Sequence, residues 1–373
     1  MSVNPIRLFH GAVSPAAEQA AQAVLRSGQI ASGPKVTEFE LAFGELIGRP
    51  HVVSTSDMSS ALFLALHLAG VGPGDEVLTL AFSCLSSNSP IAQLGAKAVW
   101  IDIDPATASM SVEDVRRAIT PRCKALMLYH VAGYPGPANE ITALCRQHGI
   151  AVIEDCNNAL GACIGAQAVG HLGDYAVYSF YPNRQLNAIE GGALVCPDHA
   201  SAQRAQRLRR FGIDAGTFRD SLGEINAESD VPELGWSASL SQLHASVGLA
   251  HLPDLAEQIQ RTRANSTLLR AATEGLNGIK AVEAVDGAES AHWGFLVLAQ
   301  RRDALLAALK GRGIHSSRLH HRNDTYTGFM TESRSLPGTD ALMAQVLALP
   351  CGWWLDDADI NRLASALQRA CAA

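Results

Sequence analysis

Several features that would assign a protein to a class at once are missing from this sequence. Its eight cysteines include no CxxC pair, and scattered cysteines are typical of reduced thiols rather than of a disulfide framework or a zinc site. The opening residues contain no apolar segment of a secretory signal. The longest apolar stretch, residues 61–72, is far shorter than the roughly 18 residues that a membrane-spanning helix needs. We therefore expect a cytoplasmic protein that binds no metal and does not enter a membrane.

Charge is scarce as well. Charged residues make up 17% of the chain, its net charge is −7, and it has no basic block. These values argue against nucleic acid or an anionic membrane surface as a partner. Apolar residues make up 47%, which is typical of a globular chain. Since single domains usually hold about 100 to 200 residues, the length of 373 residues predicts two domains, at 1–252 and 253–373.

Short runs rich in Val, Ile and Leu alternate with helical patterns in the first 200 residues. The predicted strands are 75–80, 96–104, 124–130, 150–156, 175–180 and 191–196, and the predicted helices are 59–70, 111–119 and 139–149. This alternation predicts an α/β fold, with a mostly parallel sheet covered by helices. From about residue 253 the pattern changes, and helices at 252–273, 301–313 and from 357, with strands at 279–285 and 292–299, predict a smaller α+β domain.

Polar residues follow the predicted strands at the sheet edge where such folds bind ligands. Glu154 and Asp155 end one strand, Ser179 ends another, and small polar residues at 54–60 precede a helix, as in phosphate sites. A Glu-Gly-Gly turn at 190–192 lets the backbone pass close to a ligand. An isolated Glu-Asp pair is more often a helix cap or a structural ion pair. Together, however, these groups fit a phosphorylated heteroaromatic cation such as pyridoxal phosphate (PLP).

With these residues in view, the sequence resembles the DegT/StrS family of sugar aminotransferases, PLP proteins of fold type I that act on nucleotide-linked keto-sugars. The similarity runs nearly end to end, through residues 29–48, 70–110, 152–162, 171–180, 316–329 and 346–360. It implies a large cofactor domain, a small C-terminal domain and a homodimer with active sites between the subunits. It also implies a role in amino-sugar biosynthesis.

The resemblance also implies a cofactor pocket. Asp155 matches the aspartate that pairs with the pyridinium nitrogen and keeps the ring an electron sink. Cys84 stands where an aromatic residue often covers the ring, and Ser237 replaces an asparagine that reaches the partner subunit's phosphate. The resemblance assigns the remaining pocket positions, near the phenolic oxygen and the phosphate, to Asn158, Met58, Ser59 and Ser179.

One departure from the family changes the chemistry. Arg184 replaces the Schiff-base lysine, which attacks the aldehyde as a neutral amine and then carries protons. A guanidinium has a pKa above about 12 and no free lone pair, so it does neither. Of the five lysines, only Lys35 is not excluded as a substitute by its place in the sequence. Residues 187–189 and Ser239 also depart from the family pattern, and this clustering favours a natural, specialised branch.

Three functions are therefore open. The first is an enzyme that handles a nucleotide-linked keto-sugar with non-covalent PLP or pyridoxamine phosphate (PMP), as keto-sugar dehydratases of the family do with histidine in place of lysine. The second is a binding or regulatory protein on the same scaffold. The third is an enzyme without PLP, in which Arg184 clamps a carboxylate or phosphate. The aspartate at 155 has no obvious use without a pyridinium, which favours the first.

The remaining candidates lie outside the cofactor pocket. His130 ends a predicted strand at the functional edge and is the best candidate for a substrate contact, with a catalytic role. Arg322 and Asn323 resemble a motif of one branch of the family. They contact either the nucleotide-sugar substrate or only other surface residues. An isolated histidine pair and a tryptophan pair are more often structural, and we expect this of His320, His321, Trp353 and Trp354.

Overall fold

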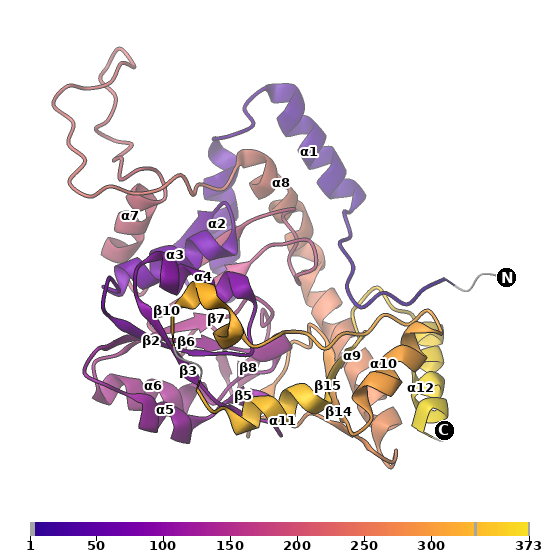
Figure 1. The fold of residues 1–373 in the computed structure, drawn as a ribbon. Coiled ribbons are helices and arrows are strands. Elements are labelled where there is room, and N and C mark those ends of the chain that lie inside the picture. Colours follow the sequence, from indigo (N-terminus) through magenta and orange to yellow (C-terminus); the bar gives the residue numbers. More distant parts are fainter. Residues whose placement is uncertain (1–3, 332–333, 372–373) are drawn as a thin grey trace.

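The central element is a seven-stranded sheet. The computed structural model describes residues 4–331 and 334–371 (Figure 1). The strands of this sheet lie in the order β1 (Val52–Thr55), β11 (Gly192–Val195), β10 (Tyr175–Ser179), β7 (Ala151–Asp155), β6 (Cys123–Tyr129), β2 (Glu76–Leu80) and β3 (Lys97–Ile101). The strand β11 pairs antiparallel with β1 and β10, and the other pairs of this sheet are parallel. The predicted α/β fold is therefore confirmed.

Helices cover the sheet on both faces, as alternating strand side chains require. On β6, Leu126 and Leu128 face a core that includes α6, whereas Ala125 and Met127 face a core that includes α3. The helices of this part are α1 (Pro15–Ser27), α2 (Pro34–Ile47), α3 (Met58–Leu68), α4 (Leu85–Gln93), α5 (Val112–Ala118), α6 (Ala138–Gln147), α7 (His199–Leu208) and α8 (Gln242–His251). The described helices include none that is long and apolar enough to cross a membrane.

A second, three-stranded sheet lies in the C-terminal part. Its antiparallel strands are ordered β12 (Ile279–Ala281), β14 (Phe295–Ala299) and β15 (Val346–Leu349), and its helices are α9 (Leu255–Thr273), α10 (Arg302–Lys310) and α12 (Asp357–Cys371). Ile6, near the N-terminus, belongs to the same core and pairs with Ile314. Part of the N-terminal segment thus packs with the C-terminal part. The division at residue 252 stays a prediction.

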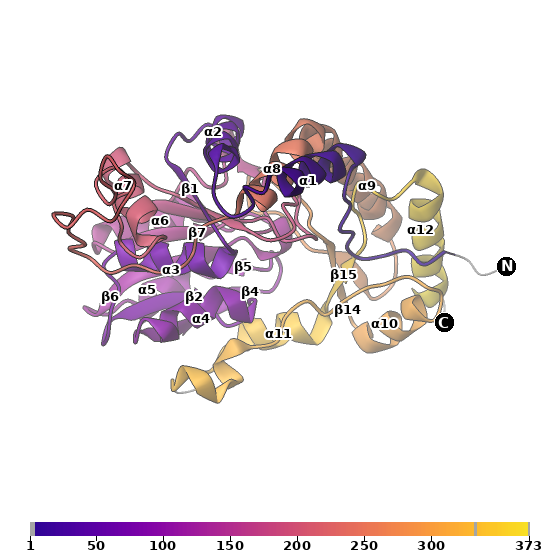
Figure 2. The ribbon, with the colours of Figure 1, turned by 90° about the horizontal axis from the view of Figure 1, so that it is seen from above.

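Residues 315–331 and 334–345, the crossing segment, return from the C-terminal part to the carboxyl ends of strands in the large sheet. The backbone of Ser317 pairs with Ala348 of β15, and that of Arg322 pairs with Phe82, which follows β2. The helix α11 (Pro337–Gln345) then lies beside β4 (Ile103–Asp104), a short strand paired with β5 (Ser109–Met110) (Figure 2). The remaining small sheet joins β8 (Cys163–Ile164), β9 (Gln167–Ala168) and β13 (Ala288–Glu289). The crossing segment brings C-terminal residues to the ends of the central strands.

Candidate functional site

Asp155, at the carboxyl end of β7, is fully buried. Ser87 Oγ donates a hydrogen bond to its Oδ2 at 2.8 Å, and Asn157 Nδ2 donates to its Oδ1 at 2.7 Å. Burial raises the pKa of this carboxyl, and these hydrogen bonds offset only part of the effect. Within the described ranges, no lysine, arginine or histidine forms an ion pair with it. A buried carboxylate of this kind is complementary to a ligand that brings a cationic N–H.

A chain of hydrogen bonds runs beside Asp155. Asn158 Nδ2 donates to the Tyr129 hydroxyl at 3.0 Å, the hydroxyl lies 3.1 Å from His320 Nε2, and His320 Nδ1 lies 3.7 Å from Cys84 Sγ. Burial, together with the charge of Arg184, lowers the pKa of His320 to about 4. Burial raises the pKa of the Cys84 thiol. Both side chains are therefore neutral near pH 7.

Arg184 follows β10, and its side chain is held in a seat formed by Trp293, Phe9 and Asn183. Its guanidinium carbon lies 5.0 Å from the ring centroid of Trp293, which stacks on Phe9 with 3.9 Å between ring centroids. Arg184 Nη1 donates to Asn183 Oδ1, and Trp293 Nε1 donates to the backbone oxygen of Asn183 at 2.6 Å. Cation–π contacts of this kind favour arginine over lysine, because the planar guanidinium stacks on the ring.

Several buried polar atoms near the ends of the central strands have no hydrogen-bond partner among the described residues. Arg184 Nε, Asn158 Oδ1 and Ser83 Oγ are shielded from solvent and have no hydrogen-bond partner within the described part of the chain. Leaving such donors and acceptors unpaired is costly, so a polar ligand that pairs with them would bind favourably. With the carboxylate of Asp155, they fit the ring of a pyridoxal-type cofactor. A cavity of about 210 Å³ is lined by Arg184 together with Pro182 and Trp353.

The expected phosphate site lies at the start of α3. A carboxylate at this position makes it less favourable for an anion. Asp57 caps this helix: its Oδ1 accepts from the Ser60 backbone N–H at 2.9 Å, and its Oδ2 accepts from the hydroxyls of Ser60 and Ser56. Ser59 donates its hydroxyl to the backbone oxygen of Ser86. The side chain of Met58 is buried, and Ser179 lies at the end of β10. A carboxylate thus stands where a phosphate is expected.

Gly192, in the 190–192 turn, has a different role from the one expected. A Cβ on Gly192 would lie 2.7 Å from the backbone of Asp57 and Met58, so this glycine allows β11 to pass close to the start of α3 rather than close to a ligand. Glu190, in the same turn, has its pKa raised by burial, with a contribution from Asp57. Acidic groups therefore gather near this end of the site.

His130 is not a free substrate-binding group, and that prediction is corrected. Its ring is fully buried, with Nε2 3.2 Å from Glu154 Oε2 and Nδ1 accepting the Gly136 backbone N–H at 3.0 Å. Glu154 also accepts three backbone N–H groups, at 170, 172 and 173. Both ring nitrogens are used, so the histidine joins the end of β6, and the loop that follows it, to Glu154 of β7. The buried group of His130, Glu154 and Cys156 is compact enough for a metal, but these contacts already satisfy it.

Arg322 and Asn323 both make contacts within the chain. Arg322 pairs with Asp324 and Asp340. Asn323 is buried, accepts a hydrogen bond from Asn88 at 3.0 Å and donates one to the Ser83 backbone oxygen at 3.0 Å. These bonds fasten the crossing segment to the large sheet. Their polar groups are engaged within the chain, and a contact with the nucleotide or the sugar stays a prediction.

Three further residues lie outside the buried site of this chain. Ser237 and Ser239 are exposed. The expected contact of Ser237 with a partner subunit stays a prediction. Lys35 lies in α2 and pairs with Glu38 on an exposed surface, 2.6 Å between charged atoms.

Comparison with known proteins identifies the family. The sequence profile of the DegT/DnrJ/EryC1/StrS aminotransferase family matches residues 13–368. The chain belongs to this family. Over 357 residues, 93% of this chain and 92% of the relative, it is 31% identical to dTDP-4-dehydro-2,3,6-trideoxy-D-glucose 4-aminotransferase of Saccharopolyspora spinosa. The resemblance inferred from the sequence is thus confirmed.

Solved structures of this family are similar in fold. The sugar aminotransferase CalS13 from Micromonospora echinospora matches with a TM-score of 0.92 and 32% identity, covering 98% of this chain and 99% of that one. The structure of DesI in the presence of its TDP-sugar product matches with a TM-score of 0.88 and 28% identity, covering 99% and 94%. These matches confirm the fold-type-I architecture and support the expectation of an enzyme. PLP is the cofactor that this family uses.

Several residues of the site were not predicted. His320 was expected to be structural, and Tyr129, Ser87 and Trp293 were not considered. Tyr129 ends a predicted strand beside that of Asp155, so its place at the sheet edge was a usable signal. His320 and Trp293 come from the C-terminal part, and only the tertiary fold brings them to Arg184.

Proposed function

We propose that this chain acts on a nucleotide-linked keto-sugar in amino-sugar biosynthesis and holds PLP or PMP without a covalent bond. The fully buried Asp155, which has no cationic partner among the described residues, carries the proposal. The relatives support the substrate class, since one acts on a dTDP-linked keto-sugar and another was solved with a TDP-sugar. A homodimer and a cytoplasmic location are part of the same proposal.

Different residues of the site would contact different parts of the cofactor. Asp155 would accept a hydrogen bond from the protonated ring nitrogen and so keep it charged, and Asn158 and Tyr129 offer polar groups to the edge of the ring. When bound, the cofactor supplies an electron sink for bond breaking beside its ring. Arg184 has neither the lone pair for covalent attachment nor a proton to give up near pH 7, even though burial lowers its pKa. Its place is that of a fixed cation.

Treatment with PLP and then borohydride tests the proposal. Reduction fixes any bond between PLP and a lysine, and gel filtration under denaturing conditions then separates free from attached cofactor. We expect PLP to bind, and the site-bound fraction to be removed completely. Asp155→Ala is the matched control: it should abolish site binding, while labelling of surface lysines, including Lys35, should not change.

Other outcomes would favour the alternatives. A reduced adduct that depends on Asp155 would show that a lysine of this chain attaches the cofactor after all. If neither PLP nor PMP binds, the cofactor part of the proposal fails. A binding or regulatory protein, or an enzyme without PLP in which Arg184 clamps an anion, would then take its place. The carboxylate of Asp57 at the expected phosphate position is the observation that gives this alternative weight.

A further inference from the structure

Arg184 brings more hydrogen-bond donors into the site than the protein uses. A guanidinium has five N–H groups and no acceptor. The structure gives its side chain one acceptor, Asn183 Oδ1, and leaves Nε shielded and unpaired within the described part of the chain. Since a shielded donor without a partner is costly, the missing acceptor is a group that a ligand can supply.

The seat of Arg184 keeps the guanidinium in place. The guanidinium of Arg184 lies over the ring of Trp293, and Trp293 stacks on Phe9. Asn183 accepts one hydrogen bond from Arg184 and one from Trp293. Moving the guanidinium away from the site would cost the cation–π contact and the bond to Asn183 together. The charge is therefore a fixed feature of the pocket.

The positive charge of Arg184 acts on the side chains that would surround the cofactor ring. Arg184 acts electrostatically on His320, Cys84, Tyr129 and Asp155, which line the site from four different segments. His320 and Cys84 are neutral near pH 7, and Tyr129 is neutral because burial raises its pKa well above the usual value. Asp155 is the carboxylate that the proposed function assigns to the ring nitrogen. With Asp155 used by the ring nitrogen, none of the other three side chains would neutralise a second cation beside Arg184.

We propose that Arg184, held by Trp293, makes the site select a cofactor form that ends in an acceptor oxygen and disfavour the form that ends in an ammonium. The inference rests on the proposed function for the identity of the ligand. An oxo or hydroxyl group accepts a hydrogen bond from the guanidinium, whereas the ammonium of PMP brings only donors and a like charge. The protein would thus retain the oxo form and release the amine form more readily.

Two stable analogues isolate this effect. Pyridoxine 5′-phosphate and PMP differ only in a hydroxyl and an ammonium, and neither forms a bond with surface lysines. Dissociation constants measured by equilibrium dialysis at pH 7.5 should show pyridoxine 5′-phosphate binding about tenfold more tightly, as expected for like charges a few ångströms apart in a partly screened site. Arg184→Gln keeps a donor but removes the charge, and it should abolish the preference.

Variants at the seat separate the contribution of Trp293 from general stability. Trp293→Phe keeps an aromatic face and should keep most of the preference, while Trp293→Leu should reduce it. Equal affinity of the two analogues in the unaltered protein, or a preference that survives Arg184→Gln, would overturn the inference and leave the proposed function standing. Failure of both analogues to bind, with the fold intact by circular dichroism, would instead overturn the proposed function.

Discussion

At the scale of single residues, two charges decide what this site accepts. Arg184 places a cation where relatives of this family are expected to have a lysine, and Asp57 places an anion where a phosphate is expected. Asp57 is also a helix cap, which accepts the Ser60 N–H at 2.9 Å. Capping requires only a side-chain oxygen, and asparagine caps as well as aspartate. The charge of Asp57 is therefore separable from its structural role.

Removing this charge should strengthen the binding of a phosphorylated ligand. In Asp57→Asn the cap remains, but the repulsion between carboxylate and phosphate is lost, so the affinity for pyridoxine 5′-phosphate should rise by about tenfold. Isothermal titration calorimetry would measure the change. Pyridoxine without the phosphate is the control, and its affinity should not change. An equal gain for both compounds would mean that Asp57 does not face the phosphate.

The close approach of Gly192 to the start of α3 offers a second test at this scale. A methyl group in Gly192→Ala would meet backbone atoms of Asp57 and Met58 at 2.7 Å, so β11 or α3 must move. We expect a loss of about 2 kcal/mol of unfolding free energy, in the range of overpacked core substitutions, measured by urea unfolding. Gly223→Ala, in the arm, has open space around it, so only its φ of 83° is unfavourable, at a cost of about 1–2 kcal/mol. A larger loss at Gly223 than at Gly192 would contradict this account.

At the scale of secondary structure, the sequence predicts elements where one pattern is strong and fails where tertiary contacts decide. The helix predicted at 111–119 is present as α5, with Ser111 as its cap. The strand predicted at 96–104 is interrupted at Asp102, because this carboxylate accepts the N–H groups of Gly338 and Thr339 at the start of α11. The strand β15 follows α11 with no turn residue between them, so its apolar residues continue the helical pattern. Contacts between distant segments cannot be read from such local patterns.

The same holds for the site. Asp155 and Ser179 end strands at one edge of the sheet, where the rules for parallel sheets place them. The seat of Arg184 could not be predicted, since Phe9, Asn183 and Trp293 come from three separate segments. His320 is held by a crossing segment whose Leu319 has φ of 65°, an unfavourable conformation that the sequence does not indicate.

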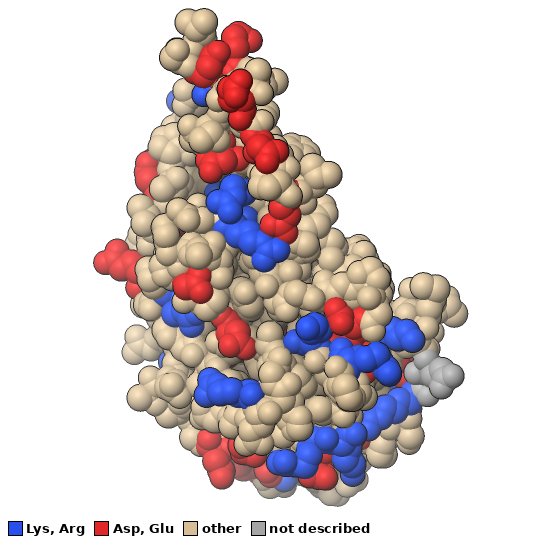
Figure 3. Space-filling view, turned by 90° about the vertical axis from the view of Figure 1, so that its left-hand side faces the viewer, with Lys and Arg blue, Asp and Glu red and all other residues tan. Residues whose placement is uncertain are grey.

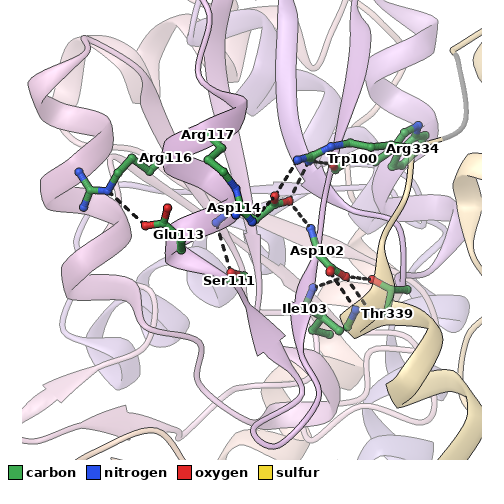
Figure 4. A network of polar contacts seen from close by, with 11 residues as sticks. Trp100, Asp102, Ile103, Ser111, Glu113, Asp114, Arg116, Arg117, Arg334 and Thr339 are labelled. Carbon is green, nitrogen blue, oxygen red and sulfur yellow. Dashed lines mark hydrogen bonds and ion pairs between the residues drawn. The ribbon is translucent and has the colours of Figure 1, made fainter.

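An ion-pair network fastens the crossing segment to the large sheet (Figure 4). Both terminal nitrogens of Arg334 bind the buried carboxylate of Asp114, at 2.6 and 2.7 Å, and the Asp102 backbone N–H donates to the same carboxylate at 2.8 Å. Burial alone would raise the pKa of Asp114, but the hydrogen bonds from Arg334, Asp102 and Arg117 hold this pKa below its usual value. The charged form of Asp114 therefore stabilises the fold.

Loss of this pair should give a pH-dependent defect. A lowered pKa in the folded protein contributes stability above the unfolded value of about 3.9, and this is lost as pH falls through the folded pKa. Arg334→Met should cost about 2 kcal/mol at pH 7, between the values for exposed and buried pairs, and the difference from the unaltered protein should shrink below about pH 4. Urea unfolding at pH 7, 5 and 3 would measure it. Arg117→Met, which removes an exposed partner of Asp114, should cost less than half as much. A defect independent of pH would contradict the assignment.

At the scale of the whole molecule, one segment suggests how two chains would meet. Residues 212–235 form an arm that stands away from the body beyond α7 (Figure 1). Acidic side chains gather on the projecting tip at the top of Figure 3, yet the arm also exposes Leu222 by 84% and Leu234 by 80%. Apolar side chains that stay exposed on a projecting segment are typical of association surfaces. Ser237, expected to reach the partner subunit's phosphate, follows directly after the arm.

If the arm docks on a second copy of this chain, association and ligand binding should fail together. We expect a dimer by sedimentation velocity, and Leu222→Ser combined with Leu234→Ser should shift it toward the monomer, because each exposed leucine would lose roughly 2 kcal/mol of burial in the interface. The same variant should bind pyridoxine 5′-phosphate more weakly, since Ser237 would no longer be brought to the neighbouring site. Leu268→Ser, at a half-exposed position on α9 in the C-terminal part, is the matched control and should change neither property. A monomer that binds the ligand with full affinity would contradict the shared site, and each chain would then have to complete its pocket alone.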